Sequence, residues 1–267
     1  ELLSTQIFEA FLEEEGVNSA LLPALDFMVI DEDNEPVLAQ IEQKLAAILA
    51  PVKDKQILVT QGFICRNPAG EVDNLKRGGS DYTASLIGGA IQAEEVQIWT
   101  DIDGMHNNDP RIVKNTFPIR ELSFAEAAEL AYFGAQVLHP QSMRPAMESD
   151  SLCVRVKNSY NIDAPGTLIG HARSKRDDWL LTSIVRKKNV TLLDIVSTRM
   201  LGQYGFLARV FAVMEKAGIS VDCIATSEVS VSLTLDPAKL WSRDLVKEEL
   251  DALVRDFEEN GIARVSY

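Results

Sequence analysis

The sequence predicts an α/β protein with a mostly parallel sheet sandwiched by helices, followed by a smaller β-α-β-β-α-β unit of ferredoxin-like type. Three observations predict it. Short apolar runs alternate with helical segments as far as Gly170, which is the pattern of a parallel sheet connected by helices. A charged stretch, 171–178, then interrupts this alternation of strands and helices. After it, strand and helix patterns follow in the order β-α-β-β-α-β to the C-terminus.

The first part of the chain contains four helical and four strand patterns. The helices are expected at 3–15, 37–49, 82–93 and 124–133, and the strands within 19–30 and at 56–60, 96–100 and 151–156. Apolar residues at helical spacing give the first helix one apolar face, made of Leu3, Ile7, Phe8, Phe11 and Leu12. The strand 56–60 is expected to be buried, and Ser80 and Asp81 are favoured N-cap residues for the third helix.

The second part supplies the ferredoxin-like pattern. Its strands are expected at 190–196, 221–226, 229–235 and 263–266, and its helices at 206–217 and 245–257. The expected domains are therefore 1–172 and 183–267, joined by a linker at 173–182.

Composition excludes several classes of partner. The 267 residues include 26 Lys and Arg against 40 Asp and Glu, a net charge of -14. Such an acidic surface argues against nucleic acid and against anionic membranes. We see no apolar run near the roughly 18 residues of a membrane span. The three cysteines are widely spaced without a CxxC pair, which favours reduced thiols in a cytosol-like compartment.

The segment 77–81, Arg-Gly-Gly-Ser-Asp, has the form of an anion-binding turn. Glycines before a helix expose free N–H groups at the positive end of the helix dipole. Arg77 offers a fork suited to a carboxylate, Ser80 a hydroxyl, and Asp81 a charge that could orient a lysine or hold a cation. Taken alone, the residues fit a tight loop with a capped helix better.

Asp101, Asp103 and Asp109 follow the expected strand 96–100. Ligands of open α/β sheets lie outside the carboxyl ends of strands, so these carboxylates could help to hold a metal-nucleotide. An acidic turn without a ligand is the alternative. The chain has no Walker loop, nucleophile elbow or zinc signature, and we assign no protein metal site.

A set of motifs in fixed order makes the sequence more specific. Together they closely resemble the aspartate kinase family, and most closely its lysine-inhibited, monofunctional members in bacteria and plants. The kinase-like motifs are Gln61–Phe63, Arg77–Ala84, Ile98–Gly104, Asp109–Arg111, Tyr132–Ala135, Leu138–Pro140 and Pro165–Ile169. The motifs that look like its ACT domain are Ser197–Gly202, Gly205–Leu207 and Thr226–Ser232.

The resemblance implies an amino-acid kinase fold followed by ACT domains. It implies transfer of the ATP γ-phosphate to the β-carboxylate of L-aspartate, with Mg²⁺, at the start of lysine, threonine and methionine synthesis. Ser80 and Asp81 would lie at the reacting centre. The implied substrate contacts are Glu1, Phe63, Arg77, Gly78, Gly79 and Ser80, and the implied nucleotide contacts are Thr100, Asp101, His106, Arg111 and Gln136.

The sequence departs from the family pattern in four ways. It begins at Glu1, after the place of the family's Lys-Phe-Gly-Gly segment and its phosphate lysine, so we expect an N-terminal truncation and a fragment that is inactive alone. His106 replaces a usual tyrosine, and Gln136 replaces a usual lysine, which puts ATP affinity in question. A second ACT domain is missing or nearly so.

The resemblance also implies a lysine effector, a homodimer formed through ACT domains, and a cytoplasmic enzyme, or a plastid one if a transit peptide lies upstream. Threonine-sensitive relatives share much of the framework, so the sequence does not fix the effector. Nor does it show whether a homoserine dehydrogenase domain follows. The implied effector contacts are Met200, Gln203, Leu207, Ser220, Val221, Asp222 and Glu228.

Two other functions stay open. One is a different amino-acid kinase, acting on glutamate or an acylated glutamate, against which the ACT-like unit and the segment 132–135 argue. The other is a non-catalytic subunit that only binds an effector. The chain's start at Glu1 and the glutamine at position 136 favour this second alternative.

Overall fold

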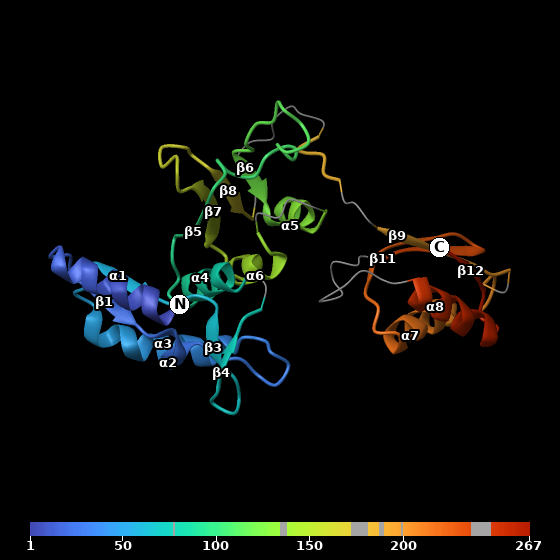
Figure 1. Cartoon of the computed structure of the whole chain (residues 1–267), viewed down its shortest axis with the longest axis horizontal. Coiled ribbons are helices and arrows are strands. Elements are labelled where there is room, and N and C mark those ends of the chain that lie inside the picture. Colours follow the sequence, from blue (N-terminus) through green and yellow to red (C-terminus); the bar gives the residue numbers. More distant parts are fainter. Residues whose placement is uncertain (77, 134–137, 172–180, 187–189, 199, 236–246) are drawn as a thin grey trace. The chain divides into compact units, whose positions relative to one another are not determined.

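A computed structural model divides the chain into two compact units, Glu1–Arg186 and Lys187–Tyr267 (Figure 1). It describes all residues except 77, 134–137, 172–180, 187–189, 199 and 236–246. Two expected site residues, Arg77 and Gln136, lie outside the described residues, as does most of the expected linker. The predicted domain limits therefore stay predictions.

The first half of unit 1 is a small parallel sheet with helices. Strand β1 (Ser19–Leu22) pairs in parallel with β2 (Ile57–Thr60), with Ser19 opposite Ile57. Its core includes Phe27, Met28, Ile41, Leu45 and Leu86. The helices of this half are α1 (Leu2–Glu14), α2 (Ala24–Phe27), α3 (Leu38–Leu49) and the short 3₁₀ helix η1 (Ala50–Val52).

The expected burial of the strand 56–60 is wrong, and most of the apolar face of α1 is exposed as well. Of the apolar residues on α1 only Leu12 is buried, whereas Leu3 is 75% and Ile7 69% exposed. Ile57 and Leu58 of β2 are exposed as well. The reason is that β1 and β2 form a sheet of only two strands, so the described residues leave part of these apolar surfaces uncovered.

The hairpin β3 (Ile64–Arg66) and β4 (Val72–Asn74) leads into α4 (Gly79–Ala90). The expected N-caps are corrected here. Gly78 is the N-cap residue and its C=O accepts the N–H of Tyr82, so Ser80 and Asp81 lie inside the first helical turn. Gly78 takes this position because its φ of 70° lies in the left-handed region.

The second half of unit 1 is a four-stranded sheet in the order β5-β7-β8-β6. The β5–β7 and β6–β8 pairs are parallel, and β7–β8 is antiparallel. The mostly parallel α/β fold is thus confirmed. The elements are β5 (Glu95–Thr100), β6 (Glu121–Ser123), α5 (Phe124–Phe133), α6 (Pro140–Glu148), β7 (Cys153–Asn158) and β8 (Thr167–Gly170).

Unit 2 confirms the β-α-β-β-α-β order. Its antiparallel sheet has the strand order β10-β11-β9-β12, and the helices lie on one face of it (Figure 1). The core joins Leu193 and Leu233 of the sheet to Val210 and Phe257 of the helices. The elements are β9 (Thr191–Val196), α7 (Phe206–Lys216), β10 (Val221–Thr226), β11 (Ser230–Leu235), α8 (Lys247–Glu259) and β12 (Arg264–Ser266). No helix in the described part of the chain is long and apolar enough to cross a membrane.

Candidate active site

The turn Gln61–Phe63 lies directly against the first turn of α4. A Cβ atom added to Gly79 would lie 2.7 Å from Cδ2 of Phe63, and one added to Gly62 would lie 3.0 Å from Cβ of Ser80. Both glycines are therefore required by close approach, since larger residues would push the turn and the helix apart. The structure thus brings together Phe63, Gly79 and Ser80, which the sequence assigned to the substrate.

Gly78 is also held by a neighbour. A Cβ atom on it would lie 2.7 Å from Cβ of His139. His139 is the N-cap of α6, and its Nδ1 accepts the Gln141 N–H at 3.4 Å. The resemblance includes His139 among its motifs, but the residue patterns gave no sign that it packs against the glycine loop.

Ser80 is exposed at the start of α4, and Asp81 is half-buried beside it. Burial raises the pKa of the Asp81 carboxyl above its ordinary value of 3.8, because desolvation disfavours the charged form. A carboxylate held at a cost in free energy suits a functional position better than a structural one. The hydroxyl and the carboxylate can hold and orient donors around a ligand.

Glu1 is the N-cap residue of α1. One helical turn further along, Thr5 contacts Gln61 of the segment 61–63. The Glu1 C=O accepts the N–H of Thr5, and the Thr5 hydroxyl accepts the Gln61 amide at 2.6 Å. Oε1 of the same buried Gln61 side chain accepts a hydrogen bond from the Ala24 N–H at 2.8 Å. Gln61, which the sequence did not single out by itself, therefore ties α1 and α2 to the site.

Two of the expected nucleotide residues, Thr100 and Asp101, lie where β5 ends beside the end of β7. Ser159 donates both its N–H and its hydroxyl to the Thr100 C=O, at 2.8 and 2.9 Å. The Thr100 hydroxyl donates to the exposed Asp101 at 3.2 Å. The Asn158 amide donates to Asp103 at 2.7 Å. Because parallel strands place their carboxyl ends at one edge, this polar edge is where a ligand is expected.

His106 and Arg111 belong to the loop that follows β5. His106 Nδ1 lies 2.9 Å from the Thr116 hydroxyl, and burial lowers the pKa of its imidazole below 6.5. The Arg111 guanidinium pairs with both oxygens of Asp109, at 3.0 and 3.1 Å, and its side chain is 76% exposed. Arg111 is accessible to a phosphate but would have to exchange this partner.

The expected effector residues of unit 2 fall into two groups at opposite ends of β10. Ser220, Val221 and Asp222 lie where β10 begins, beside Leu235 at the end of β11. Met200, Gln203, Leu207 and Glu228 lie at the other end, where the Ser197 N–H donates to the Val229 C=O. Six residues of strand span about 20 Å, so one copy of unit 2 does not bring the two groups together.

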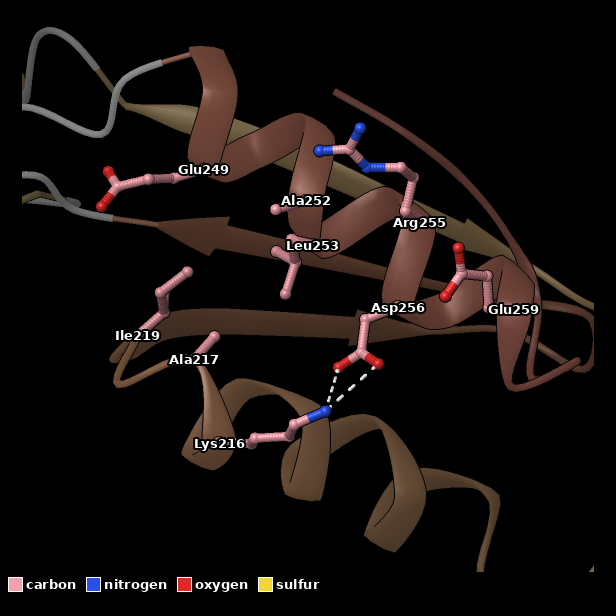
Figure 2. A pocket seen from close by; sticks show the side chains of 9 residues that line it. All are labelled: Lys216, Ala217, Ile219, Glu249, Ala252, Leu253, Arg255, Asp256 and Glu259. Atoms are coloured by element: carbon pink, nitrogen blue, oxygen red, sulfur yellow. Dashed lines mark hydrogen bonds and ion pairs between the residues drawn. The ribbon is translucent and has the colours of Figure 1, made fainter.

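A groove of about 470 Å³ lies elsewhere on unit 2, between the C-terminal end of α7 and α8 (Figure 2). Lys216 pairs with Asp256 across it at 3.3 Å. None of the expected effector residues lines this groove. In the described residues of the chain, no three His, Cys, Asp or Glu side chains cluster as metal ligands would.

Residues 1–158 match the family model described as "Amino acid kinase family", and 193–241 match that of an ACT domain. The chain belongs to the amino acid kinase family. The polar edge and the turn at α4 are thus parts of an amino acid kinase domain, and unit 2 is an ACT domain.

Aspartokinases of a plant and of a bacterium are similar along the whole chain. Aspartokinase 1, chloroplastic, of Arabidopsis thaliana is 50% identical over 99% of the chain and 47% of its own length. Lysine-sensitive aspartokinase 3 of Escherichia coli is 40% identical over 100% of the chain and 61% of its own length. The structure of E. coli aspartokinase III in complex with aspartate and ADP superposes with a TM-score of 0.80 and 38% identity, over 100% of this chain and 59% of that one. The chain therefore spans about half to three fifths of these relatives.

Proposed function

We propose that the protein is an aspartate kinase, which transfers the γ-phosphate of ATP to the β-carboxylate of L-aspartate and forms 4-phospho-L-aspartate. The observation that carries this proposal is the similarity to aspartokinases along the whole chain, at 40–50% identity. The reaction is the first step toward lysine, threonine and methionine. A similar enzyme solved with aspartate and ADP supports the choice of substrate and nucleotide.

The two sides of the site have separate tasks in this reaction. On the substrate side, the turn 61–63 and the start of α4 enclose aspartate, with Arg77 on a carboxylate and Glu1 on the ammonium group. Ser80 and Asp81 stand next to the reacting oxygens. Phosphoryl transfer depends on positioning and on charge stabilisation, and the close contacts of Gly62 and Gly79 supply a rigid frame for both.

On the nucleotide side, Thr100 and Asp101 contact the nucleotide and Arg111 its phosphates, with His106 and Gln136 nearby. Mg²⁺ is usually bound by one or two carboxylates together with phosphates and water. The carboxylate of Asp101, exposed directly after β5, fits that requirement, and this residue would hold the ion together with the phosphates. When bound, Mg²⁺ neutralises charge on the transferred phosphoryl group.

We further propose that lysine inhibits the enzyme by binding at a homodimer interface of the ACT domain. Strand β10 is an edge of the described sheet. If two copies paired antiparallel along β10, Asp222 of one would lie near Glu228 of the other, which would join the two groups of effector residues. These carboxylates suit the ammonium groups of lysine. The similar E. coli enzyme is named lysine-sensitive.

The compartment is proposed to be the cytoplasm or a plastid. The Arabidopsis relative is named chloroplastic, and an E. coli relative is comparably similar. The reaction itself is the same in either place.

The decisive experiment uses the full-length protein from the reading frame that contains this chain. With ATP and Mg²⁺, aspartate should give an acyl phosphate that hydroxylamine traps as hydroxamate, and glutamate should give almost none. Equal turnover of glutamate would indicate a different amino-acid kinase. No turnover of either, together with lysine binding, would support the non-catalytic subunit.

A further inference from the structure

We propose that Thr83 is a positioning residue for the phosphoryl transfer: its hydroxyl locks Phe63 in a left-handed turn and so fixes the aspartate side of the site. The inference rests on the proposed function, since it names a residue that the proposed reaction would need. Thr83 lies in the second turn of α4, one residue beyond Tyr82, and is 2% exposed. It acts through Phe63 and is not placed in contact with substrate.

Phe63 has an unfavourable backbone conformation. Its φ is 71°, in the left-handed region that side chains other than glycine, asparagine and aspartate rarely occupy. The Ile64 N–H donates to the Gly62 C=O at 2.8 Å, which makes Phe63 the centre of a three-residue γ-turn. With a positive φ, this turn is the rare and strained form. The Phe63 side chain is 37% exposed, so burial of the ring does not account for the turn.

Hydrogen bonds from two other segments hold the Phe63 backbone. The Phe63 N–H donates to Oγ1 of Thr83 at 3.0 Å, and the Thr83 hydroxyl donates to the Gly79 C=O at 2.8 Å. The Phe63 C=O accepts the Leu75 N–H at 2.8 Å. The turn is thus pinned on one side to α4 and on the other to the loop that carries Arg77.

The Thr83 hydroxyl uses its donor and an acceptor lone pair at the same time. Valine has nearly the same shape but neither capacity, so it leaves the Phe63 N–H without its partner. A strained conformation persists only while its surroundings hold it. Without the hydroxyl we expect the turn to relax, which moves the Phe63 ring from Gly79 and Gly62 from Ser80. The nucleotide side, at the ends of β5 and β7, makes none of these contacts.

The kinetic test compares Thr83→Val and Thr83→Ser in the full-length protein. For Thr83→Val we expect kcat/KM for aspartate to fall about tenfold or more, roughly the effect of one buried hydrogen bond. The KM for ATP should change less than about twofold. Thr83→Ser keeps the hydroxyl and should stay within about threefold of wild type. Equal losses for aspartate and ATP, or no rescue by serine, would overturn the proposal.

Ser85→Ala is the matched control. Ser85 is 1% exposed in the same helix, so the variant also removes a buried hydroxyl, but not one bonded to the turn. Its aspartate KM should stay within about twofold of wild type. A loss as large as that of Thr83→Val would mean that any buried change in α4 suffices, which would contradict a specific role for Thr83.

A second measurement does not depend on activity or on a stable valine variant. In the wild-type protein, the backbone amides of Phe63 and Leu75 should exchange with solvent slowly, and in Thr83→Val the Phe63 amide should exchange about tenfold faster or more. Fast exchange of the Phe63 amide in the wild type would refute the proposal that the Thr83 hydroxyl holds this turn. A wild type with protected amides but no aspartate turnover would instead refute the proposed function alone.

Discussion

Asp81 illustrates how a side chain proposed to act in catalysis can lower stability. Its pKa is raised because burial penalises the charged form. Between the unfolded value of 3.8 and the raised folded value, the folded state binds more protons than the unfolded state. Stability therefore falls as pH rises through that window, and the loss persists at neutral pH.

Asp81→Asn should remove this penalty. We expect a thermal midpoint at pH 7 that equals or exceeds that of wild type, with a difference that shrinks as the pH is lowered toward 3.8. Activity should fall about a hundredfold or more, the usual cost of losing a charged group at a reacting centre. Thermal unfolding from pH 7 to pH 4 and hydroxamate assays measure both. A lower midpoint that does not vary with pH would contradict the burial argument.

Arg77 lies outside the described residues, so its proposed role is tested by substitution. Arg77→Ala should raise the aspartate KM about tenfold or more, because it removes a two-pronged contact to a carboxylate, and leave the ATP KM nearly unchanged. Lys76→Ala is the matched control, because it removes a neighbouring positive charge that pairs with Asp73 at 3.6 Å and is not proposed to bind substrate. An unchanged aspartate KM in Arg77→Ala would refute the carboxylate contact.

At the scale of elements, α4 joins the site to the sheet. It packs against α6 and β5, and two adjacent glycines lie in its last turns. A Cβ atom on Gly88 would overlap Cγ2 of the buried Val96 in β5, whereas the nearest atom to one on Gly89 is Cβ of Pro145 at 3.5 Å. Gly88 is therefore required for close packing of α4 on β5, whereas the space around Gly89 would accept a side-chain methyl group.

This difference gives a paired prediction. Gly88→Ala should lower the free energy of unfolding by about 1–3 kcal/mol, as overpacking does. Gly89→Ala should leave it unchanged or raise it by up to about 1 kcal/mol, through better helix propensity. Urea denaturation measures both variants. A Gly88→Ala protein as stable as Gly89→Ala would show that the helix and sheet can separate at little cost.

At the scale of the whole molecule, the proposed dimer and the proposed lysine site stand together. Ile224→Glu places a charge in the middle of the exposed edge strand β10 and should give a monomer by sedimentation that also loses lysine binding by calorimetry. Asp222→Ala should weaken lysine binding about tenfold or more yet stay a dimer. Glu258→Ala, on the exposed side of α8, is the control for charge loss. A monomer that still binds lysine at full strength would disprove a shared site.

Local sequence patterns predicted most of the helices and strands, because apolar periodicity and the backbone preferences of glycine and proline influence the conformation of only a few neighbouring residues. They correctly predicted α1, α3, α7 and the order in which strands and helices follow one another along unit 2. They missed α6, which begins at Pro140 and contains Pro145, and the short hairpin β3–β4. They also predicted that β2 is buried, which depends on neighbouring strands that a local pattern does not report.

Ordered motifs along the chain were enough to predict the family, the two-part architecture and the residues on which catalysis is proposed to depend. Which of these residues meet became visible only in the folded protein. The tertiary structure placed Phe63, Gly79 and Ser80 in contact, added His139, Gln61 and Thr83, and separated Asp222 from Glu228. The physical reason is that close approach of backbones and hydrogen bonds between distant segments depend on three-dimensional packing, which no spacing along the chain encodes.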